Sequence, residues 1–406
     1  MSSYLDTAKK SECCGCGACY QVCPVNAITM IEDEEGFRYP VINEKTCIHC
    51  NKCRRVCPID THEKFEDEHM AWGGYNKDNN IREKSTSGGA FTAIAEYWLE
   101  QENAVVYGAE LVEPTKIVHS CVSKKEDLER HRKSKYIQSD VGNTFVEVLD
   151  AIKNGKKVLY SGTPCQIAGL KNVLGKYSND ENLLLVEVVC EGVPSPLYIK
   201  KYIKYLENKY KKKVKVYDWR YKNKNKWDFE FTKVEFNDGS NYKLSRWFNP
   251  FWSVWLKHLM SRPSCYECPF TTSERCADIT IADLWGVHIY CPELYGKNKG
   301  ASLVIANSCK GKKHWNMIKD RMYGHELRFE DAIKYQGPMR KHIPYNELRE
   351  ECMNDLKNDE VSYKQICKKW ASKPSPKLLF QKYIYGNRQK VAIWNLKNKL
   401  KGNGGA

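Results

Sequence analysis

Apolar and polar positions alternate along two stretches of the chain in the pattern of antiparallel hairpins. In the first, residues 27–42 alternate on both sides of the polar sequence EDEEG. In the second, residues 227–244 alternate on both sides of Asn237-Asp238-Gly239, a sequence that favours a tight turn. We therefore predict one hairpin near the N-terminus and another in the middle of the chain.

Other segments predict a mixture of buried strands and helices. Short strands are expected at residues 71–76, 103–111 and 116–123. The runs KKVLYSG and LLLVEVV are apolar without alternation, as in strands buried on both faces. After STSGG, apolar residues recur every three or four positions up to Leu99, which predicts a helix. Beyond residue 310 the pattern is polar and helical, with a break at SKPSPK.

The nineteen cysteines add chemistry to this outline, because eight of them repeat the spacing C-x2-C-x2-C-x3-C-P. In bacterial ferredoxins the first three thiolates of each run bind one [4Fe-4S] cluster and the fourth binds the other. We assign the first cluster to Cys13, Cys16, Cys19 and Cys57, and the second to Cys47, Cys50, Cys53 and Cys23. Zinc and disulfides fit this doubled spacing far less well. Cys14 is expected to lie beside the first cluster as a non-ligand, and a register slip to Cys14 is the alternative.

A second group of cysteines lies farther along the chain. Cys265 and Cys268 form a CxxC pair, which is half of a metal site. Cys165 and Cys190 each follow a buried strand, and ligands often lie at the carboxyl ends of such strands. These two cysteines are therefore candidates for completing the site. Cys276 is the local rival, and a structural role for the buried cysteines is the alternative.

The net charge of +15 is unevenly distributed. Residues 368–401 contain ten Lys or Arg and no acid, and residues 200–226 form a second basic stretch. Such stretches are either solvated helix faces or surfaces for an acidic partner, an anionic ligand or an anionic membrane. The chain carries no nucleic-acid recognition module, so we expect no nucleic-acid partner.

Composition also bears on location. The sequence has no apolar run of about 18 residues and no apolar leader at its start. Many cysteines without an export signal indicate metal ligands in a reducing compartment. We expect a cytoplasmic protein from an anaerobic or low-oxygen setting, with a peripheral position at the inner membrane face as a further option.

Five ordered segments over about residues 10–310 resemble the coenzyme F-420 hydrogenase/dehydrogenase beta subunit family. They are STSGGAF, SKYIQSDVG, VLYSGTPCQIAGL, VVCEGVPSP and RPSCYECPF with ADITIADLWG. The chain is most similar to an orphan branch that carries an N-terminal 2[4Fe-4S] ferredoxin domain. It departs from the family pattern at Glu191, because histidine commonly follows the cysteine there.

The resemblance implies an α+β chain. A bacterial-ferredoxin-like domain is expected over residues 1–62, and a linker over 63–84. A mixed α/β domain that binds FAD and a [4Fe-4S] cluster would cover residues 85–309, and a basic helical region would cover 310–406. The cluster of the flavin domain would use Cys165, Cys190, Cys265 and Cys268.

The resemblance also implies which residues contact FAD. They are Ser87, Gly88, Gly89, Lys135, Tyr136, Gln138, Ser139, Gly162, Thr163, Pro164 and Gln166. No acid or base is assigned firmly. Glu191 is the best candidate because it adjoins Cys190 at a strand end, and an exposed turn glutamate is the alternative.

These expectations lead to a ferredoxin-linked, flavin-dependent oxidoreductase. Clusters move single electrons, a hydride carries two, and a flavin interconverts them. Electrons would come from an external ferredoxin or another redox partner protein. The small organic substrate would be a deazaflavin or a polysaccharide-pathway intermediate. No GxGxxG fingerprint is present, so NADH is expected to be a poor donor. The alternative is an electron-transfer subunit that serves a separate catalytic partner.

Overall fold

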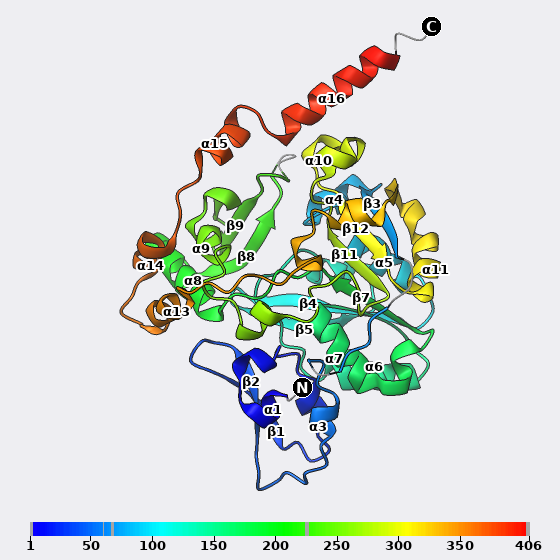
Figure 1. Ribbon diagram of the computed structural model, residues 1–406, viewed down its shortest axis with the longest axis vertical. Coiled ribbons are helices and arrows are strands. Elements are labelled where there is room, and N and C mark those ends of the chain that lie inside the picture. Colours follow the sequence, from blue (N-terminus) through cyan, green and yellow to red (C-terminus); the bar gives the residue numbers. More distant parts are fainter. Residues whose placement is uncertain (1–2, 60, 66–68, 224–226, 403–406) are drawn as a thin grey trace.

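The computed structural model describes residues 3–59, 61–65, 69–223 and 227–402 of the 406-residue chain. An eight-stranded mixed sheet lies at its centre (Figure 1). From edge to edge the strands are β13 (Met322–Leu327), β3 (Met70–Asn76), β12 (Ser302–Ala306), β11 (Ile279–Asp283), β7 (Leu183–Val188), β6 (Lys157–Gly162), β4 (Ala104–Glu113) and β5 (Lys116–Val122). The four neighbours β11, β7, β6 and β4 run parallel to one another, and the outer strands pair antiparallel.

The apolar runs of the sequence form the centre of this sheet. Leu159, Tyr160 and Leu184 are fully buried, as the continuous apolar pattern of β6 and β7 predicts. Helices α5 (Ala90–Leu99) and α11 (Cys309–Ile318) contribute to the core on one face. Helices α6 (Thr144–Lys153) and α7 (Pro164–Leu174) contribute to the core on the other face. The parallel strands therefore end at an edge that is framed by helices on both sides.

The N-terminal region packs against α6 and α7 rather than hanging free (Figure 1). Its hairpin pairs β1 (Ile28–Glu32) with β2 (Arg38–Ile42), as predicted. The helices of this region are α1 (Tyr4–Thr7), α2 (Ala18–Gln21) and α3 (Lys52–Arg55). The backbone N–H of Phe145 donates to Oε1 of Gln21 across 2.9 Å, and Arg349 forms a buried ion pair with Glu35 of the hairpin turn. The N-terminal cysteines are thus held in a fixed place against the main body.

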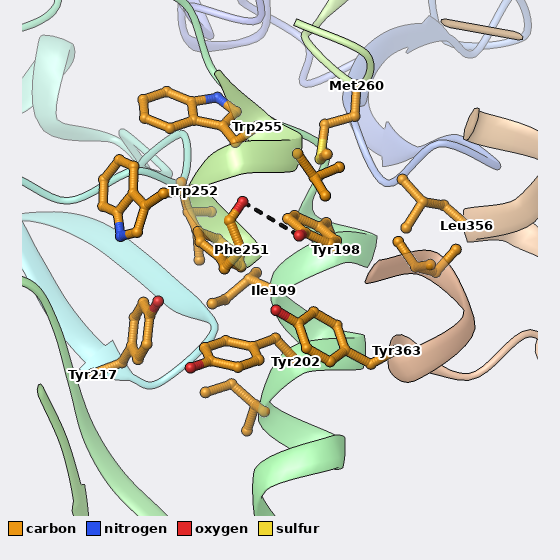
Figure 2. Close-up of a cluster of buried hydrophobic side chains, with 14 of the residues drawn as sticks. Tyr198, Ile199, Tyr202, Tyr217, Phe251, Trp252, Trp255, Met260, Leu356 and Tyr363 are labelled. Atoms are coloured by element: carbon orange, nitrogen blue, oxygen red, sulfur yellow. Dashed lines mark hydrogen bonds between the residues drawn. The ribbon is translucent and has the colours of Figure 1, made fainter. Parts of the chain in front are cut away.

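A smaller antiparallel sheet packs beside the large one. It contains β8 (Val214–Tyr221), β9 (Phe231–Phe236) and β10 (Asn241–Ser245), and β9–β10 is the second predicted hairpin. Around it lie α8 (Pro196–Tyr210), α9 (Pro250–Trp255), α13 (Arg349–Lys357) and α14 (Tyr363–Trp370). Figure 2 shows their buried aromatic cluster, in which the hydroxyl of Tyr198 donates to the carbonyl oxygen of Phe251 across 3.2 Å.

Two strands lie outside the expected boundaries of the α/β domain. β3 is the strand that we expected at residues 71–76. We had assigned it to the linker segment 63–84, yet it pairs with β12 on one side and β13 on the other. β13 falls in the region 310–406, where we expected only helices. The large sheet therefore extends from residue 70 to residue 327, because β13 needs β3 as its partner and β3 needs β12.

The remaining elements are short, apart from the two helices at the C-terminus. The short helices are α4 (Asn79–Lys84), α10 (Val287–Tyr290) and α12 (Phe329–Ile333). The 3-10 turns are η1 (Lys10–Glu12), η2 (Lys125–Arg130), η3 (Gly175–Asn179), η4 (Arg246–Phe248), η5 (Pro263–Glu267), η6 (Pro292–Asn298), η7 (Lys319–Arg321) and η8 (Gly337–Met339). Helices α15 (Pro376–Tyr383) and α16 (Asn387–Gly402) project from the body (Figure 1). Within the described residues no helix is both long and apolar enough to cross a membrane.

Candidate metal centres and cofactor cavity

The first ferredoxin site is a cavity of about 30 Å³ near the N-terminus. All four thiols assigned to the first cluster line it: Cys13, Cys16, Cys19 and Cys57. Gly17 caps α2 with a φ of +79°, a conformation that suits glycine, so the chain turns sharply between the second and third cysteines. Burial, together with the thiols of Cys13 and Cys57, raises the pKa of Cys19. A bound iron cluster would stabilise the thiolates that this environment otherwise disfavours.

The second ferredoxin site uses the loop before α3 and the end of α2. Its four thiols are partly exposed: Cys23, Cys47, Cys50 and Cys53. Backbone N–H groups donate to two of the sulfurs, from Ala27 to Cys23 across 3.2 Å and from His49 to Cys47 across 3.4 Å. Hydrogen bonds to sulfur are one of the ways in which proteins set cluster potentials.

A third set of thiols surrounds a cavity of about 50 Å³, which we call the cysteine cavity. Its cysteines are Cys14, Cys165, Cys190, Cys265 and Cys268. Cys165 is the second residue of α7, and Cys190 follows the end of β7. Cys265 lies within η5, and Cys268 follows that turn directly. Thus the fold brings together the two strand-end cysteines and the CxxC pair, as the sequence suggested.

The electrostatics of the cysteine cavity suit an iron-sulfur cluster. Burial and the neighbouring thiol of Cys268 raise the pKa of Cys265 to about 12. Burial and the thiol of Cys165 raise the pKa of Cys268 to about 11. Burial also raises the pKa of Cys190. Such crowded thiols ionise readily only when a positively charged metal centre binds among them.

Two further cysteines differ in their relation to this cavity. Cys276 is buried in the apolar cluster that includes residues of α7, and it is not among the residues that line the cysteine cavity. Cys14 lines both the cysteine cavity and the first ferredoxin site. Its thiol shares hydrogen bonds with Cys16, which raises the pKa of Cys14, and with Cys165. Cys14 therefore lies between two candidate clusters, whereas we expected it beside only one.

A much larger cavity of about 570 Å³ adjoins the cysteine cavity. It opens at the carboxyl ends of β6, β7 and β11, and the small sheet and α9 form its opposite wall. Nine of the eleven residues expected to contact FAD line this large cavity. They are Ser87, Gly89, Lys135, Tyr136, Gln138, Ser139, Gly162, Thr163 and Gln166.

The other two expected contacts lie elsewhere. Pro164 lines the cysteine cavity instead. Gly88 faces the sheet, where an added Cβ would lie 2.5 Å from the carbonyl oxygen of Gly74 and 2.5 Å from the amide nitrogen of Ser302. Glycine is needed at position 88 because two backbone segments meet there.

The large cavity and the cysteine cavity share one wall. It consists of Gln138, Thr163, Pro338 and the continuous segment Cys190, Glu191, Gly192 and Val193. Gly192 has a φ of +90°, and an added Cβ would lie 3.2 Å from the Cβ of Cys265. The segment after β7 therefore supplies a thiol to one cavity and a boundary to the other.

Comparison with known families bears on what these sites are. Two family models describe the N-terminal and C-terminal parts of the coenzyme F420 hydrogenase/dehydrogenase beta subunit, and they match residues 71–145 and 155–331 respectively. The chain belongs to this beta subunit family. Two 4Fe-4S dicluster models match residues 12–61 and 39–88. The protein is therefore an iron-sulfur protein of an oxidoreductase family, with ferredoxin-type clusters at its N-terminus.

Among solved structures, this protein is similar to a chain from a xenon-derivatised F420-reducing [NiFe] hydrogenase complex of Methanosarcina barkeri. The two chains share 18% identity with a TM-score of 0.42. The alignment covers 76% of this chain and 92% of the other. A comparison with curated proteins gave no match.

The large cavity also contains charged residues that the sequence analysis did not single out. Arg220 and Arg246 reach it from the small sheet side. Arg220 pairs with Asp283 and Glu230, and Arg246 pairs with Glu230. The pairing of these opposite charges offsets the cost of taking each of them out of water, so removing one partner would leave a buried, uncompensated charge. It depends on long-range contacts between β8, β9 and β11, so no local motif reveals it.

Two histidine side chains that line the large cavity have neutral imidazoles. Burial lowers the pKa of His119 to about 4 and that of His131 to about 3. Nε2 of His119 lies 3.0 Å from the carbonyl oxygen of Ser161, and Nε2 of His131 lies 2.8 Å from the hydroxyl of Ser120. These histidines can thus provide neutral hydrogen-bonding groups beside the strand ends.

Lys135 and Glu191 are ionisable residues of the large cavity whose pKa values are shifted by burial. Burial lowers the pKa of Lys135 to about 7. Its Nζ donates to the carbonyl oxygens of Arg132 and Lys133 across 2.8 and 3.3 Å, and it forms no salt bridge within the described part of the chain. Burial raises the pKa of Glu191. An unpaired cation and a protonatable acid therefore border the same space.

Proposed function

We propose that this chain is an iron-sulfur flavoprotein oxidoreductase in which the cysteine cavity binds a third [4Fe-4S] cluster and the large cavity binds FAD. The observation that carries the proposal is the wall shared by the two cavities. A cluster and a flavin on either side of the Cys190–Val193 segment would lie next to each other. Adjacent redox centres are what electron transfer inside a protein requires.

The residues of the chain have distinct tasks in this proposal. Cys165, Cys190, Cys265 and Cys268 would hold the cluster, and Lys135 would bind the negatively charged pyrophosphate of FAD. Gly89 caps the N-terminus of α5 at the cavity edge, where free N–H groups also favour a phosphate. When bound, clusters supply single-electron transfer and FAD converts it to two-electron chemistry. The aromatic wall of α9 would exclude water from the site.

For the reaction, we propose hydride transfer to or from a small organic substrate, a deazaflavin or a polysaccharide-pathway intermediate. An external ferredoxin or an equivalent partner protein would exchange electrons at the N-terminal sites. Glu191 would hold or release a proton at its carboxyl oxygen, since burial raises the pKa of that carboxyl. Glu191 lines both cavities, so it would lie beside both groups if they bind there.

Anaerobic stopped-flow spectroscopy tests the proposal. After mixing with reduced ferredoxin, cluster absorbance should bleach first and flavin absorbance afterwards. Cys265→Ser should abolish the flavin phase and leave the first phase intact. Rapid flavin reduction by NADH that is indifferent to Cys265→Ser would contradict the proposal.

A second candidate is an electron-transfer subunit whose substrate site lies on another polypeptide. The matched family models describe beta subunits, which favours this candidate. The two candidates differ in a simple experiment, because a subunit would reduce a substrate only after its partner is added. Turnover by the purified chain alone would favour the oxidoreductase.

We further propose that the C-terminal helices attach the protein to an anionic membrane, so that it is a peripheral protein of the inner membrane face. Val391 of α16 is buried against the segment around α10 and η6. Ile393, Leu396 and Leu400 lie on the opposite side of the helix and are 43%, 59% and 67% exposed. One side of α16 therefore fastens the helix to the body, and the other side presents apolar residues to solvent.

Charge supports a lipid surface as the partner of these helices. The basic stretch 368–401 contains no acid, so an anionic bilayer would meet no repulsion. Lys390, Lys397 and Lys401 lie beside the apolar stripe, where their long side chains can reach lipid headgroups. α15 adds the exposed side chains of Phe380 and Tyr383. An acidic protein partner is the competing outcome of the vesicle experiment described in the Discussion.

A further inference from the structure

Arg262 is a buried cation without a carboxylate partner in the described structure. It is 1% exposed. Two other buried arginines have carboxylate partners: Arg275 pairs with Glu187, and Arg349 pairs with Glu35. Buried Arg82 lacks an ion pair as well, but it donates to the carbonyl oxygen of Gly300 far from any cysteine motif. No described carboxylate lies within ion-pair distance of Arg262. A charge buried in this way is costly unless another anionic group balances it.

The guanidinium of Arg262 is directed at the first ferredoxin site. Its Nε donates to the carbonyl oxygen of Cys13 across 2.8 Å, and one Nη lies 3.5 Å from the Sγ of Cys13. The other Nη donates to Oε1 of Gln138 across 3.2 Å. The ring of Tyr39 packs against the guanidinium at 4.4 Å. The cation is therefore held in place on a ligand of the first cluster.

The backbone of Arg262, in contrast, belongs to the cysteine cavity. Its N–H donates to the carbonyl oxygen of Val193 across 3.0 Å, and its carbonyl oxygen accepts from the N–H of Cys265 across 2.9 Å. The side chain also lines the cysteine cavity together with Cys14. Arg262 is thus in contact with the first ferredoxin site and with the candidate third cluster at once.

We propose that Arg262 is a counter-charge shared by the first and third clusters, and that it raises the reduction potential of both. The role at the third cluster rests on the function proposed above. Each electron that enters a cluster adds negative charge, and a nearby buried cation stabilises the reduced form. One guanidinium between two clusters therefore keeps both reducible within the same range of potentials.

Anaerobic redox titration of the full chain, followed by electron paramagnetic resonance, tests this role. Arg262→Gln should lower the reduction equilibrium constants of the first and third clusters by about tenfold each, which is about 59 mV for a one-electron couple. Arg262→Lys keeps the charge and should restore most of the shift. Arg38→Gln is the matched control, because that guanidinium already pairs with Asp140 nearer the surface. It should leave the third cluster unchanged.

A second variant decides the question if Arg262→Gln loses iron. Gln138→Glu places a carboxylate against the guanidinium without removing it, and should lower both potentials. If a variant keeps about twelve irons and its reduction potentials are unchanged, the proposed role of Arg262 would be overturned, while the proposed function would stand. About eight irons in the wild-type protein would mean that no third cluster is bound. The proposed function would then fail together with the role of Arg262 as a shared counter-charge.

Discussion

The cysteine cavity and the large cavity share a wall, but they are built in different ways. The cysteine cavity gathers thiols from α7, the end of β7 and η5, and its donors point to one kind of ligand. The large cavity is lined by polar, charged and aromatic groups from many elements, and it includes both the paired Arg220 and the unpaired Lys135. Donor chemistry indicates what the cysteine cavity could bind, whereas only shape and charge characterise the large cavity.

The largest expected effect is the loss of the third cluster. Cys265→Ser should reduce the iron content from about twelve to about eight per chain, because the variant lacks one of four ligands. Cys276→Ser is the matched control, since Cys276 is buried outside the cysteine cavity and should keep all its iron. Iron and sulfide analysis of anaerobically prepared protein measures both. Equal iron contents in wild type and Cys265→Ser would mean that the cysteine cavity binds no cluster, and the contrast between the two cavities would not hold.

The next effect concerns the large cavity. Lys135→Gln should weaken FAD binding by about 10- to 100-fold, because a charged hydrogen bond to phosphate contributes about 1.5–3 kcal/mol. Lys156→Gln, at the exposed residue just before β6, should bind like wild type. Fluorescence titration of flavin-depleted protein gives the affinities. If both variants bind alike, Lys135 is no part of the flavin site.

The pH dependence of FAD binding sharpens this prediction. The pKa of Lys135 is about 7, so its ammonium is already formed below pH 7. Above pH 7 the amine is neutral, and binding of an anion must take up a proton. The affinity should therefore fall as pH rises from about 7 to 9, by at most about tenfold per unit. Lys135→Gln should flatten this profile, and an unchanged slope would exclude Lys135 as its source.

A smaller effect is expected at the C-terminal helices. Leu396→Asp places a charge among the exposed apolar residues of α16 and should weaken binding to anionic vesicles by about tenfold or more. Asn395→Asp is the control for charge alone, because it adds the same charge one residue away from that stripe. Co-sedimentation with anionic and neutral vesicles is the measurement. Absence of binding to either kind by wild type would favour an acidic protein partner.

The smallest effect belongs to Cys14. We expect Cys14→Ser to keep about twelve irons in the full chain, since each cluster already has four other thiol ligands. Loss of about four irons would instead make Cys14 a ligand and overturn the assignment of the eight ferredoxin cysteines. The same iron and sulfide analysis decides.

The sequence predicted what depends on local spacing. The ferredoxin runs, the CxxC pair and both hairpins are encoded within short segments, and Cys165 and Cys190 could be paired because parallel strands end at one edge. β13 was missed because its short segment between helical stretches becomes a strand only by pairing with β3. The close approach of two backbone segments at Gly88 was not predicted, because it depends on residues far apart in the chain.

The position of Arg262 was also hidden, for a related reason. Its backbone belongs to the cysteine cavity, yet its side chain reaches Cys13, nearly 250 residues earlier in the chain. The second contact of Cys14, with Cys165, is also long in range. Local motifs thus identified the ligands of the clusters, while the groups that connect one site to the next depend on how the N-terminal region packs on α7.

Quantification of iron and flavin in the anaerobically purified full-length protein tests the central claim most directly. A cluster in the cysteine cavity and FAD in the large cavity predict about twelve irons per chain, together with one extractable FAD. About eight irons without flavin would mean that the protein carries only its ferredoxin clusters, and would contradict the account of both cavities.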